Sequence, residues 1–151
     1  SDTDGYVKML KEMAGDDPNI IFTGFVSGKL LEEIYSNAYV YVLPSKLEGM
    51  PLSLLEAMSY GNCVIGSDIA EIADVVEDKA ILFKKANVED LKEKLQMVCD
   101  DVELVEKYKS EASGYICGKY NWEDVVSRTL RVYQKGKKIN ENLNDKQVSI
   151  S

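Results

Sequence analysis

Apolar and polar positions follow two different spacings along this chain, and the changes between them predict a succession of helices and short strands. Apolar residues recur at helical spacing in the segments 4–15, 29–37, 52–60, 88–119 and 122–137. A break near Asp100 divides the segment 88–119 into two helices, and residues 69–77 predict a short helix or an irregular turn. Runs of β-branched and other apolar residues predict strands at 20–23, 39–43, 63–66 and 80–83.

The order of these elements predicts the fold class. Four short apolar strands separated by helices favour a mainly parallel sheet that is covered by helices on both faces. Right-handed crossover connections then give an α/β, Rossmann-like three-layer sandwich. The chain lacks a G-x-G-x-x-G segment, so the fingerprint of nicotinamide-binding and flavin-binding domains is missing.

The composition fits one ordinary domain and narrows its partners. The chain has 151 residues, of which 45% are apolar and 29% are charged, enough for a buried core and a soluble surface. Its net charge of -8 would repel phosphates, which argues against nucleic acid as a partner. No apolar run approaches the roughly 18 residues that a membrane-spanning helix needs.

The cysteines and the missing histidines limit the chemistry. Cys63, Cys99 and Cys117 are widely spaced and odd in number, which favours free thiols in a cytoplasmic protein over a disulfide or a metal site. The chain contains no histidine, which removes Ser-His-Asp and Cys-His arrangements and the commonest metal ligand. Acid–base or charge-stabilising chemistry must come from carboxylates, lysine, tyrosine, cysteine or the substrate.

The segment 44–56, PSKLEGMPLSLLE, has the features of an anion-binding loop. It follows a predicted strand, contains a glycine and opens a helix at Pro51, which fits the first helical position. Ligands of open α/β sheets bind beyond the carboxyl ends of the strands, and the free N–H groups of a helix start attract phosphate. The sequence therefore predicts an anion cradle, with donors from the neighbours of Pro51, made of Gly49, Met50, Pro51 and Leu52.

Two glutamates flank this cradle. Glu48 lies in the loop before it and Glu56 lies inside the following helix, near Ser53. A carboxylate beside a phosphate is reasonable when it accepts hydrogen bonds from neutral hydroxyls, as on a sugar or a ribose. A nucleotide-sugar, with hydroxyls on both sides of its phosphates, has this layout. The spacing alone also fits an ordinary loop pair at Glu48 and a solvated helix face at Glu56.

At this segment the sequence resembles a known enzyme family. Glu48 and Glu56 are separated by seven residues, which matches the E-x7-E signature of retaining GT-B glycosyltransferases and is especially similar to family four, also called group 1. The residues on both sides of each acid also match the family, and the resemblance covers roughly residues 1 to 134. The segments that carry it besides the two acids are 21–26, 35–38, 43–45, 55–58, 61, 64–65, 67–68, 71 and 120–122.

The resemblance implies a role for the chain and for its site residues. Residues 1–134 would be the donor-binding domain, the carboxyl-terminal half of a GT-B fold, truncated at its amino-terminal side. Glu48 would be the catalytic carboxylate beside the donor sugar, contacting sugar hydroxyls and stabilising an oxocarbenium-like transition state, and Glu56 would bind the ribose hydroxyls. Backbone amides of Gly49, Met50, Pro51 and Leu52 would contact the diphosphate and sugar, and Gly24, Phe25 and Val26 would lie by the base. The reaction would need no metal ion and no other cofactor, and a hexose-type sugar would be transferred with retention.

The chain also departs from the family's pattern. The Lys or Arg pair that holds the donor phosphates in relatives would lie upstream of this chain. The family's Gly-Gly-x-Pro-Glu run is replaced by Asp68-Ile69-Ala70-Glu71, which puts the local turn in question. Without these cations and the amino-terminal acceptor-binding domain, the chain alone is expected to bind nucleotides weakly and to be inactive as a transferase. The base, the sugar, the acceptor and the oligomeric state stay open.

Two other functions fit parts of the sequence. A non-catalytic α/β ligand-binding or regulatory module could use Asp68, at a strand end, as a phospho-acceptor, although Ser67-Asp68 more often caps the following turn. A GT-B fold epimerase or phosphorylase would share the donor domain.

The polar tail 135–151 is predicted to be disordered alone or to dock on something else, and its Lys135–Lys138 cluster allows either peripheral contact with an acidic membrane or a solvated helix end.

Overall fold

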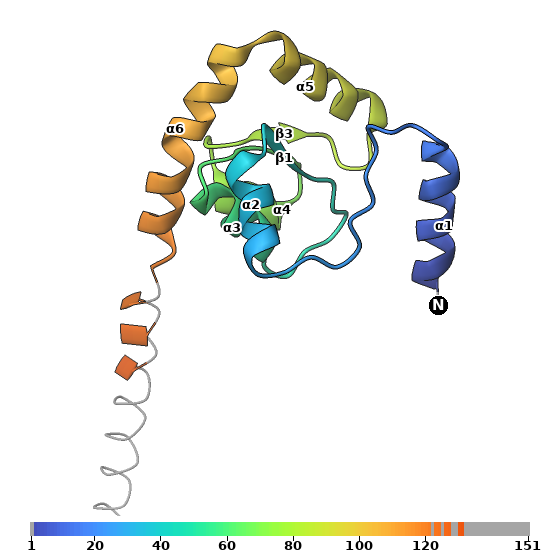
Figure 1. The fold of residues 1–151 in the computed structure, drawn as a ribbon. Helices are drawn as coiled ribbons and strands as arrows, with labels where there is room; N and C mark the ends of the chain where they lie inside the picture. Colours follow the sequence, from blue (N-terminus) through green and yellow to red (C-terminus); the bar gives the residue numbers. More distant parts are fainter. Residues whose placement is uncertain (1, 122, 125, 128–129, 132–151) are drawn as a thin grey trace, which may run out of the picture. The chain divides into compact units, whose positions relative to one another are not determined.

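A computed structural model of the chain describes residues 2–121, 123–124, 126–127 and 130–131 (Figure 1). The chain forms two compact units, Ser1–Glu33 and Ile34–Ser151. The first unit contains helix α1 (Asp2–Ala14) and the start of α2 (Lys29–Asn37), which continues into the second unit. α1 ends at Gly15, whose φ of 57° is the left-handed conformation with which helices commonly stop.

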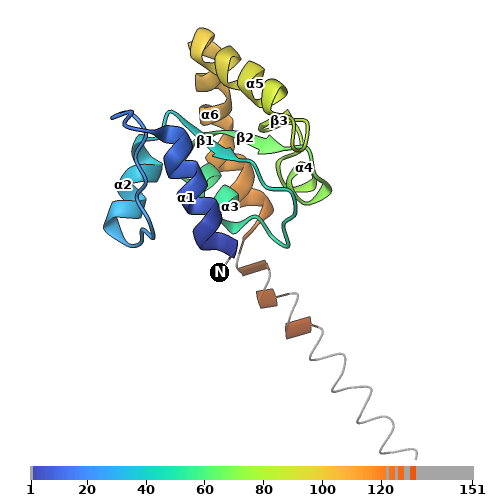
Figure 2. The same cartoon turned by 90° about the vertical axis from the view of Figure 1, so that its right-hand side faces the viewer.

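The second unit is an α/β sandwich built on a parallel sheet. Its strands and helices follow one another as β1 (Val40–Leu43), α3 (Leu52–Ser59), β2 (Cys63–Ser67), α4 (Ala70–Val76), β3 (Ile81–Phe83), α5 (Val88–Asp100) and α6 (Val102–Lys119). The three strands lie in the order β1-β2-β3, and both neighbouring pairs are parallel (Figure 2). Val42 is paired with Ile65, and Ile65 is paired with Ile81. The predicted α/β class and the parallel sheet are confirmed.

One predicted strand is wrong. Residues 20–23 form no strand in the structure, so the described sheet has three strands where the sequence predicted four. The segment leaves a turn in which the Asp17 carboxylate accepts the N–H of Asn19 at 2.9 Å and the Ile20 N–H donates to the Asp17 carbonyl at 3.2 Å. An apolar run indicates β-propensity, but a strand also needs a neighbouring strand to pair with.

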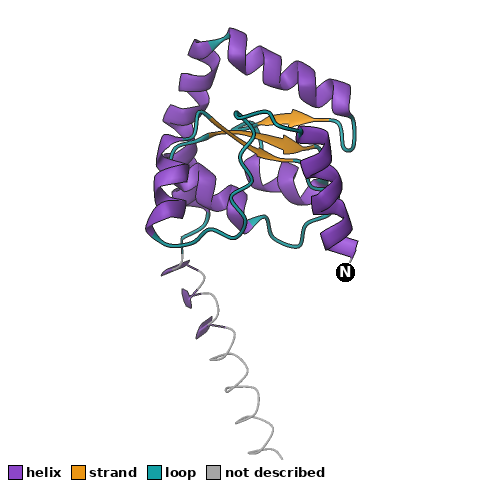
Figure 3. Cartoon of the chain, turned by 45° about the vertical axis from the view of Figure 1, so that its right-hand side comes forward, coloured by secondary structure: helices purple, strands orange, loops and turns teal. Residues whose placement is uncertain are grey.

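The central strand β2 is buried along its whole length, because helices cover both faces of the sheet (Figure 3). On one face Cys63 and Ile65 join Val98 of α5 and Val105 of α6 in a core cluster. On the other face α3 and α4 cover the sheet, and side chains of both helices lie close to Gly66. Such burial on both faces explains why β2 reads as a continuous apolar run rather than an alternating one.

Close packing explains the glycine in β2. A methyl group built on Gly66 would lie 2.8 Å from Cγ2 of Ile72 and 3.8 Å from Cδ1 of Leu54. Ile72 and Leu54 are both fully buried, so neither can move aside without disturbing the core. Gly66 therefore allows α4 and α3 to pack directly against the central strand.

Apart from the start of α1, which lies two residues earlier than predicted, the ends of the labelled helices agree with the sequence to within a residue. α5 ends at Asp100, and the predicted break follows because Asp101 caps α6 by accepting the Leu104 N–H at 2.9 Å. The predicted cap at Asn121 is confirmed, since its side chain accepts the Glu123 N–H at 2.8 Å. Pro51 stands at the N-cap of α3 rather than at the predicted first helical position, because the Leu52 N–H turns back to the Met50 carbonyl at 2.8 Å.

The predicted side-chain cap is absent from the start of α4 in the structure. Ile69 occupies the N-cap of α4, and no side chain caps it. The Ser67 hydroxyl has no hydrogen-bond partner among the described residues, and the Asp68 N–H donates instead to the Phe83 carbonyl at 2.7 Å. The prediction that Ser67-Asp68 caps this turn is wrong because Ile69, rather than Ser67 or Asp68, occupies the N-cap position.

The last turn of α6 is fixed to the end of α4. The ammonium group of Lys119 donates to the carbonyls of Asp74 at 2.7 Å and Val75 at 3.1 Å, and forms an ion pair with Glu77 at 2.7 Å. Glu77 has a φ of 49°, which is uncommon for a residue other than glycine. Lys119 thus supplies the cation that a helix C-terminus attracts, from a different helix.

Some expectations fall on residues outside the described part of the chain. Trp122, Val125 and Tyr133, which belong to the predicted apolar stripe of the last helix, and the tail 135–151 are among them. Within the described ranges, no helix combines the length and the apolar character needed to cross a bilayer.

The packing at β2 predicts the effect of adding one methyl group. Gly66→Ala should lower the free energy of unfolding by about 1–3 kcal/mol, because Ile72 must shift within a filled core. Denaturant unfolding followed by circular dichroism measures this change. Gly114→Ala on α6 is the matched control: nothing lies within 4 Å of its added methyl group, so alanine should raise stability by about 0.5–1 kcal/mol. Equal effects of the two substitutions would contradict the packing argument.

Candidate functional site

The two glutamates of the predicted site occupy the loop and the helix that follow β1. Glu48 lies half-buried in the loop, and its carboxylate accepts a hydrogen bond from the Ser45 hydroxyl at 2.5 Å. This short distance is typical of a hydroxyl that donates to an ionised carboxylate. The bond closes the loop between the end of β1 and Glu48, so the acid is held close to the carboxyl edge of the sheet.

Glu56 is an exposed residue on α3, and its carboxylate contacts a buried tyrosine. The hydroxyl of Tyr35 lies 3.3 Å from Oε2 of Glu56 and 3.3 Å from the carbonyl oxygen of Ser53. A phenol has one proton, so Tyr35 shares it between these two acceptors. The orientation of the Glu56 carboxylate is therefore linked to a side chain from α2.

A second tyrosine lies within electrostatic range of both acids. The hydroxyl of Tyr41, on β1, donates to the Ser53 hydroxyl at 2.8 Å. Burial raises the pKa of Tyr41, the Ser53 bond lowers it, and the negative charges of Glu48 and Glu56 raise it further. Both carboxylates thus act on one phenol, which shows that the structure brings the two predicted acids to the same region.

The tyrosines form a packed group. The Tyr35 ring stacks on Tyr60 with centroids 5.5 Å apart, and lies 5.9 Å from the Tyr41 ring at a tilted angle of 49°. Burial raises the pKa of Tyr35 to about 12, and Tyr41 and the Glu56 carboxylate add to this rise. Tyr35 therefore stays a neutral hydrogen-bond donor at physiological pH.

Only some of the backbone N–H groups of the predicted anion cradle are available as hydrogen-bond donors. The Leu52 N–H is occupied by the Met50 carbonyl, and Pro51 has no N–H. Among the described residues, no hydrogen bond is found for the backbone N–H groups of Gly49, Met50 and Ser53. Gly49 and Met50 are exposed, so the donors at the start of α3 are Gly49, Met50 and Ser53, of which the sequence had not indicated the last.

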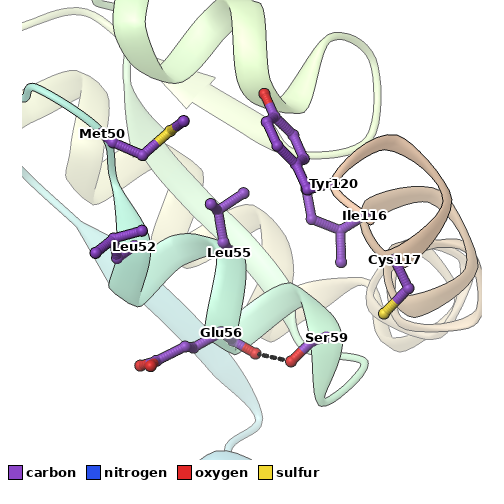
Figure 4. Close-up of a pocket in the computed structure, with 8 residues that line it drawn as sticks. All are labelled: Met50, Leu52, Leu55, Glu56, Ser59, Ile116, Cys117 and Tyr120. Atoms are coloured by element: carbon purple, nitrogen blue, oxygen red, sulfur yellow. Dashed lines mark hydrogen bonds between the residues drawn. The ribbon is translucent and has the colours of Figure 1, made fainter. Parts of the chain in front are cut away.

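A cavity of about 540 Å³ lies on the other side of α3 (Figure 4). Figure 4 shows Leu55, Met50 and Tyr120 pointing into it, whereas the carboxylate of Glu56 points away. The bond drawn in it joins the Ser59 hydroxyl to the Glu56 carbonyl at 2.7 Å. The cavity is bounded by α3 and the end of α6; Glu56 is among its lining residues, but Glu48 is not.

The remaining predicted site residues belong to the first unit. Gly24, Phe25 and Val26 lie within Ser1–Glu33, and Gly24 has a φ of 65° that suits glycine. The two acids and the start of α3 belong to the second unit. The assignment of these three residues to a nucleotide base stays a prediction.

Sequence reasoning missed the tyrosines whose hydroxyl groups contact α3 beside the acids. Tyr35 matched the resemblance only as part of a helix end, and Tyr41 was predicted to serve packing. Their contacts with α3 join residues 12 to 21 positions apart, which no local pattern reports. Ser45 lies only three residues before Glu48, so its bond to the acid is local in the sequence.

Comparison with known proteins assigns the family. The model of the family described as glycosyl transferases group 1 matches residues 4–114. An α/β unit with a parallel sheet and flanking helices is also the architecture of GT-B enzymes. The chain therefore belongs to the group 1 glycosyl transferases.

Individual relatives agree with this family. An uncharacterized glycosyltransferase of Methanocaldococcus jannaschii is 28% identical over 131 residues, which are 85% of this chain and 34% of the relative. The sulfoquinovosyl transferase SQD2 of Arabidopsis thaliana is 33% identical over 113 residues, 72% of this chain and 22% of the relative. The chain thus spans about a third of the length of these relatives, or less.

A solved structure shows the fold. HepE of Anabaena, in complex with UDP and glucose, superposes with a TM-score of 0.80 at 16% identity. The superposition covers 87% of this chain and 37% of HepE.

The raised pKa of Tyr35 predicts a loss of stability at high pH. The unfolded chain titrates this phenol near 10.0 and the folded chain near 12, so folding favours the neutral form. This contribution is complete below about pH 10 and is lost as the pH rises towards 12. Tyr35→Phe should therefore flatten the alkaline fall of the free energy of unfolding, measured by denaturant titration from pH 8 to 12 in ~1-unit steps. Parallel pH curves for the two proteins would contradict the prediction.

Proposed function

We propose that this chain is the donor-binding half of a retaining glycosyltransferase, which takes a nucleotide-diphosphate sugar and transfers a hexose-type sugar to an acceptor. The observation that carries the proposal is the placing of Glu48 and Glu56 on either side of the start of α3, with both charges acting on Tyr41. Two acids with unpaired backbone donors between them suit a ligand that has hydroxyl groups at both ends and phosphates in the middle.

The start of α3 would hold the diphosphate. The unpartnered N–H groups of Gly49, Met50 and Ser53 supply hydrogen-bond donors, and the dipole of α3 adds partial positive charge at the same end. The chain's net charge of -8 makes these donors more important, because the surrounding protein repels phosphate. Further cations for the phosphates would come from a Lys or Arg pair outside this chain.

Glu48 would act at the donor sugar. When the bond between the anomeric carbon and the diphosphate breaks, positive charge develops on the sugar ring. A carboxylate held by Ser45 at 2.5 Å needs little reorganisation to stabilise that charge. Its hydrogen-bond acceptors can also orient the sugar hydroxyls before the bond breaks. Glu56, farther along α3, would accept the two ribose hydroxyls of the nucleotide.

The acceptor would bind to an amino-terminal domain of the same enzyme. The chain covers 34% and 22% of its two named relatives and 37% of HepE, which is consistent with a missing domain. A nucleotide-sugar donor is supported by HepE, which binds UDP and glucose. The donor domain would comprise residues 1–134. The chain alone would bind nucleotide weakly and transfer no sugar.

The cellular setting is also a proposal. Cys63, Cys99 and Cys117 are free thiols in the structure, which suits a reducing cytoplasm. The lysines between 135 and 138 would supply peripheral contact with an acidic membrane surface in the intact enzyme. No nucleic acid partner is expected.

Glu56→Ala should weaken nucleotide binding. Loss of a charged acceptor for the ribose hydroxyls should raise the Kd about tenfold or more. Isothermal calorimetry with UDP, GDP and ADP, on the chain and on the longest natural protein that contains it, measures this change and identifies the base. Glu93→Gln, which alters an exposed acid on α5, is the control and should bind like the unaltered protein.

The same titration tests for a metal requirement. Excess EDTA should leave the Kd unchanged, because the proposed contacts use only backbone donors and carboxylates. Binding that disappears with EDTA, or that Glu56→Ala leaves intact, would overturn the proposed site.

Glu48→Gln should separate catalysis from binding. Loss of the negative charge beside the anomeric carbon should lower kcat about 100-fold or more, whereas nucleotide affinity should change little. Transfer by the intact enzyme is measured with the donor that binds best, and the configuration of the product tests retention. A parallel loss of affinity and turnover would place Glu48 in binding rather than in catalysis.

A further inference from the structure

Tyr35 contributes a buried polar group to a site that is otherwise exposed. Its side chain is 7% exposed, whereas Glu56, which it contacts, is an exposed residue. The hydroxyl of Tyr35 lies 3.3 Å from Oε2 of Glu56. An exposed glutamate on a helix normally samples several rotamers, so a fixed donor at one oxygen restricts its freedom.

The position of Tyr35 is itself fixed by a buried amide. The Asn62 side chain, 2% exposed, donates to the carbonyl of Tyr35 at 2.9 Å and to the carbonyl of Ala57 at 2.9 Å. Asn62 thereby ties the end of α2 to the end of α3 at the entry to β2. Tyr35 and Glu56 are held on two helix ends that share one hydrogen-bonded link.

The neighbouring tyrosine does not compete for the Glu56 carboxylate. Tyr41 donates its single hydroxyl proton to the Ser53 hydroxyl at 2.8 Å. The alternatives for the Tyr35 proton are then the Ser53 carbonyl and the Glu56 carboxylate, both at 3.3 Å. The charged acceptor makes the stronger bond at equal distance.

We infer that Tyr35 is a positioning residue for nucleotide binding: its hydroxyl holds the Glu56 carboxylate in the orientation that accepts the two vicinal hydroxyls of a ribose. Tyr35 touches no part of the nucleotide and acts only through Glu56. Because the carboxylate is ordered before the ligand arrives, less conformational entropy is lost on binding. The inference rests on the proposed function, in which Glu56 binds ribose.

The test compares a ribonucleotide with its analogue that lacks the ribose hydroxyls. The probes are whichever of UDP, GDP and ADP binds best and the 2′,3′-dideoxy form of the same nucleotide. Tyr35→Phe keeps the ring against Tyr41 and Tyr60 and removes only the hydroxyl. It should raise the Kd of the ribonucleotide about two- to tenfold and leave the Kd of the dideoxy form unchanged. In a Glu56→Ala background, Tyr35→Phe should have no further effect on either nucleotide.

Two controls separate positioning from packing. Tyr60→Phe alters a tyrosine that stacks on Tyr35, and it should bind both nucleotides like the unaltered protein. In the unaltered protein, the ring NMR signal of Tyr35 should shift with the ribonucleotide and less with the dideoxy form. This second measurement needs no substituted protein.

The outcomes distinguish the inference from the function on which it rests. Suppose that the unaltered protein binds a ribonucleotide. If Tyr35→Phe then lowers the affinity for both nucleotides equally, or for neither of them, Tyr35 does not act through Glu56 and the inference is overturned. A further loss in the Glu56→Ala background would also overturn it. If the unaltered intact protein binds none of the three nucleotides, the proposed function fails first, and the inference fails with it.

Discussion

The burial of β2 on both faces is the constraint on which the second unit depends. All five residues of this strand are buried, with α5 and α6 on one side and α3 and α4 on the other. The strand cannot carry a side chain at Gly66 without displacing Ile72, so the two helix layers approach as closely as backbone allows. This packing fixes α3 against the sheet, and the loop that carries Glu48 must join β1 to that fixed helix.

The site is organised by aromatic residues that lie beneath it. Glu48 and Glu56 lie in the loop after β1 and on α3, but Tyr35 and Tyr41 come from other elements and reach α3 with their hydroxyl groups. A buried phenol suits this task because its rigid ring packs like an apolar residue while its hydroxyl still donates. The Tyr35 ring packs against Tyr41 and Tyr60, and its hydroxyl contacts the surface carboxylate of Glu56.

Local signals predicted most of this structure, and the failures involve contacts between distant residues. The side chains of Asp101 and Asn121 accept backbone N–H groups two or three residues further along the chain. Because these contacts are local, the sequence could locate both helix starts. Residues 20–23 have the composition of a strand, but strand formation depends on a partner that no local pattern specifies. The two acids were predicted from their spacing and the resemblance of the segment around them, whereas the contact of Tyr35 with Glu56 spans 21 positions and could be seen only in three dimensions.

The bonds of Lys119 have a mechanical consequence. The last turn of a helix usually unwinds first, but here the final residue of α6 is attached to two carbonyls and a carboxylate at the end of α4. A pulling force on the chain beyond Tyr120 would therefore be shared with α4 and, through Ile72, with the central strand. The bonds of Lys119 would have to break before the end of α6 could separate from α4.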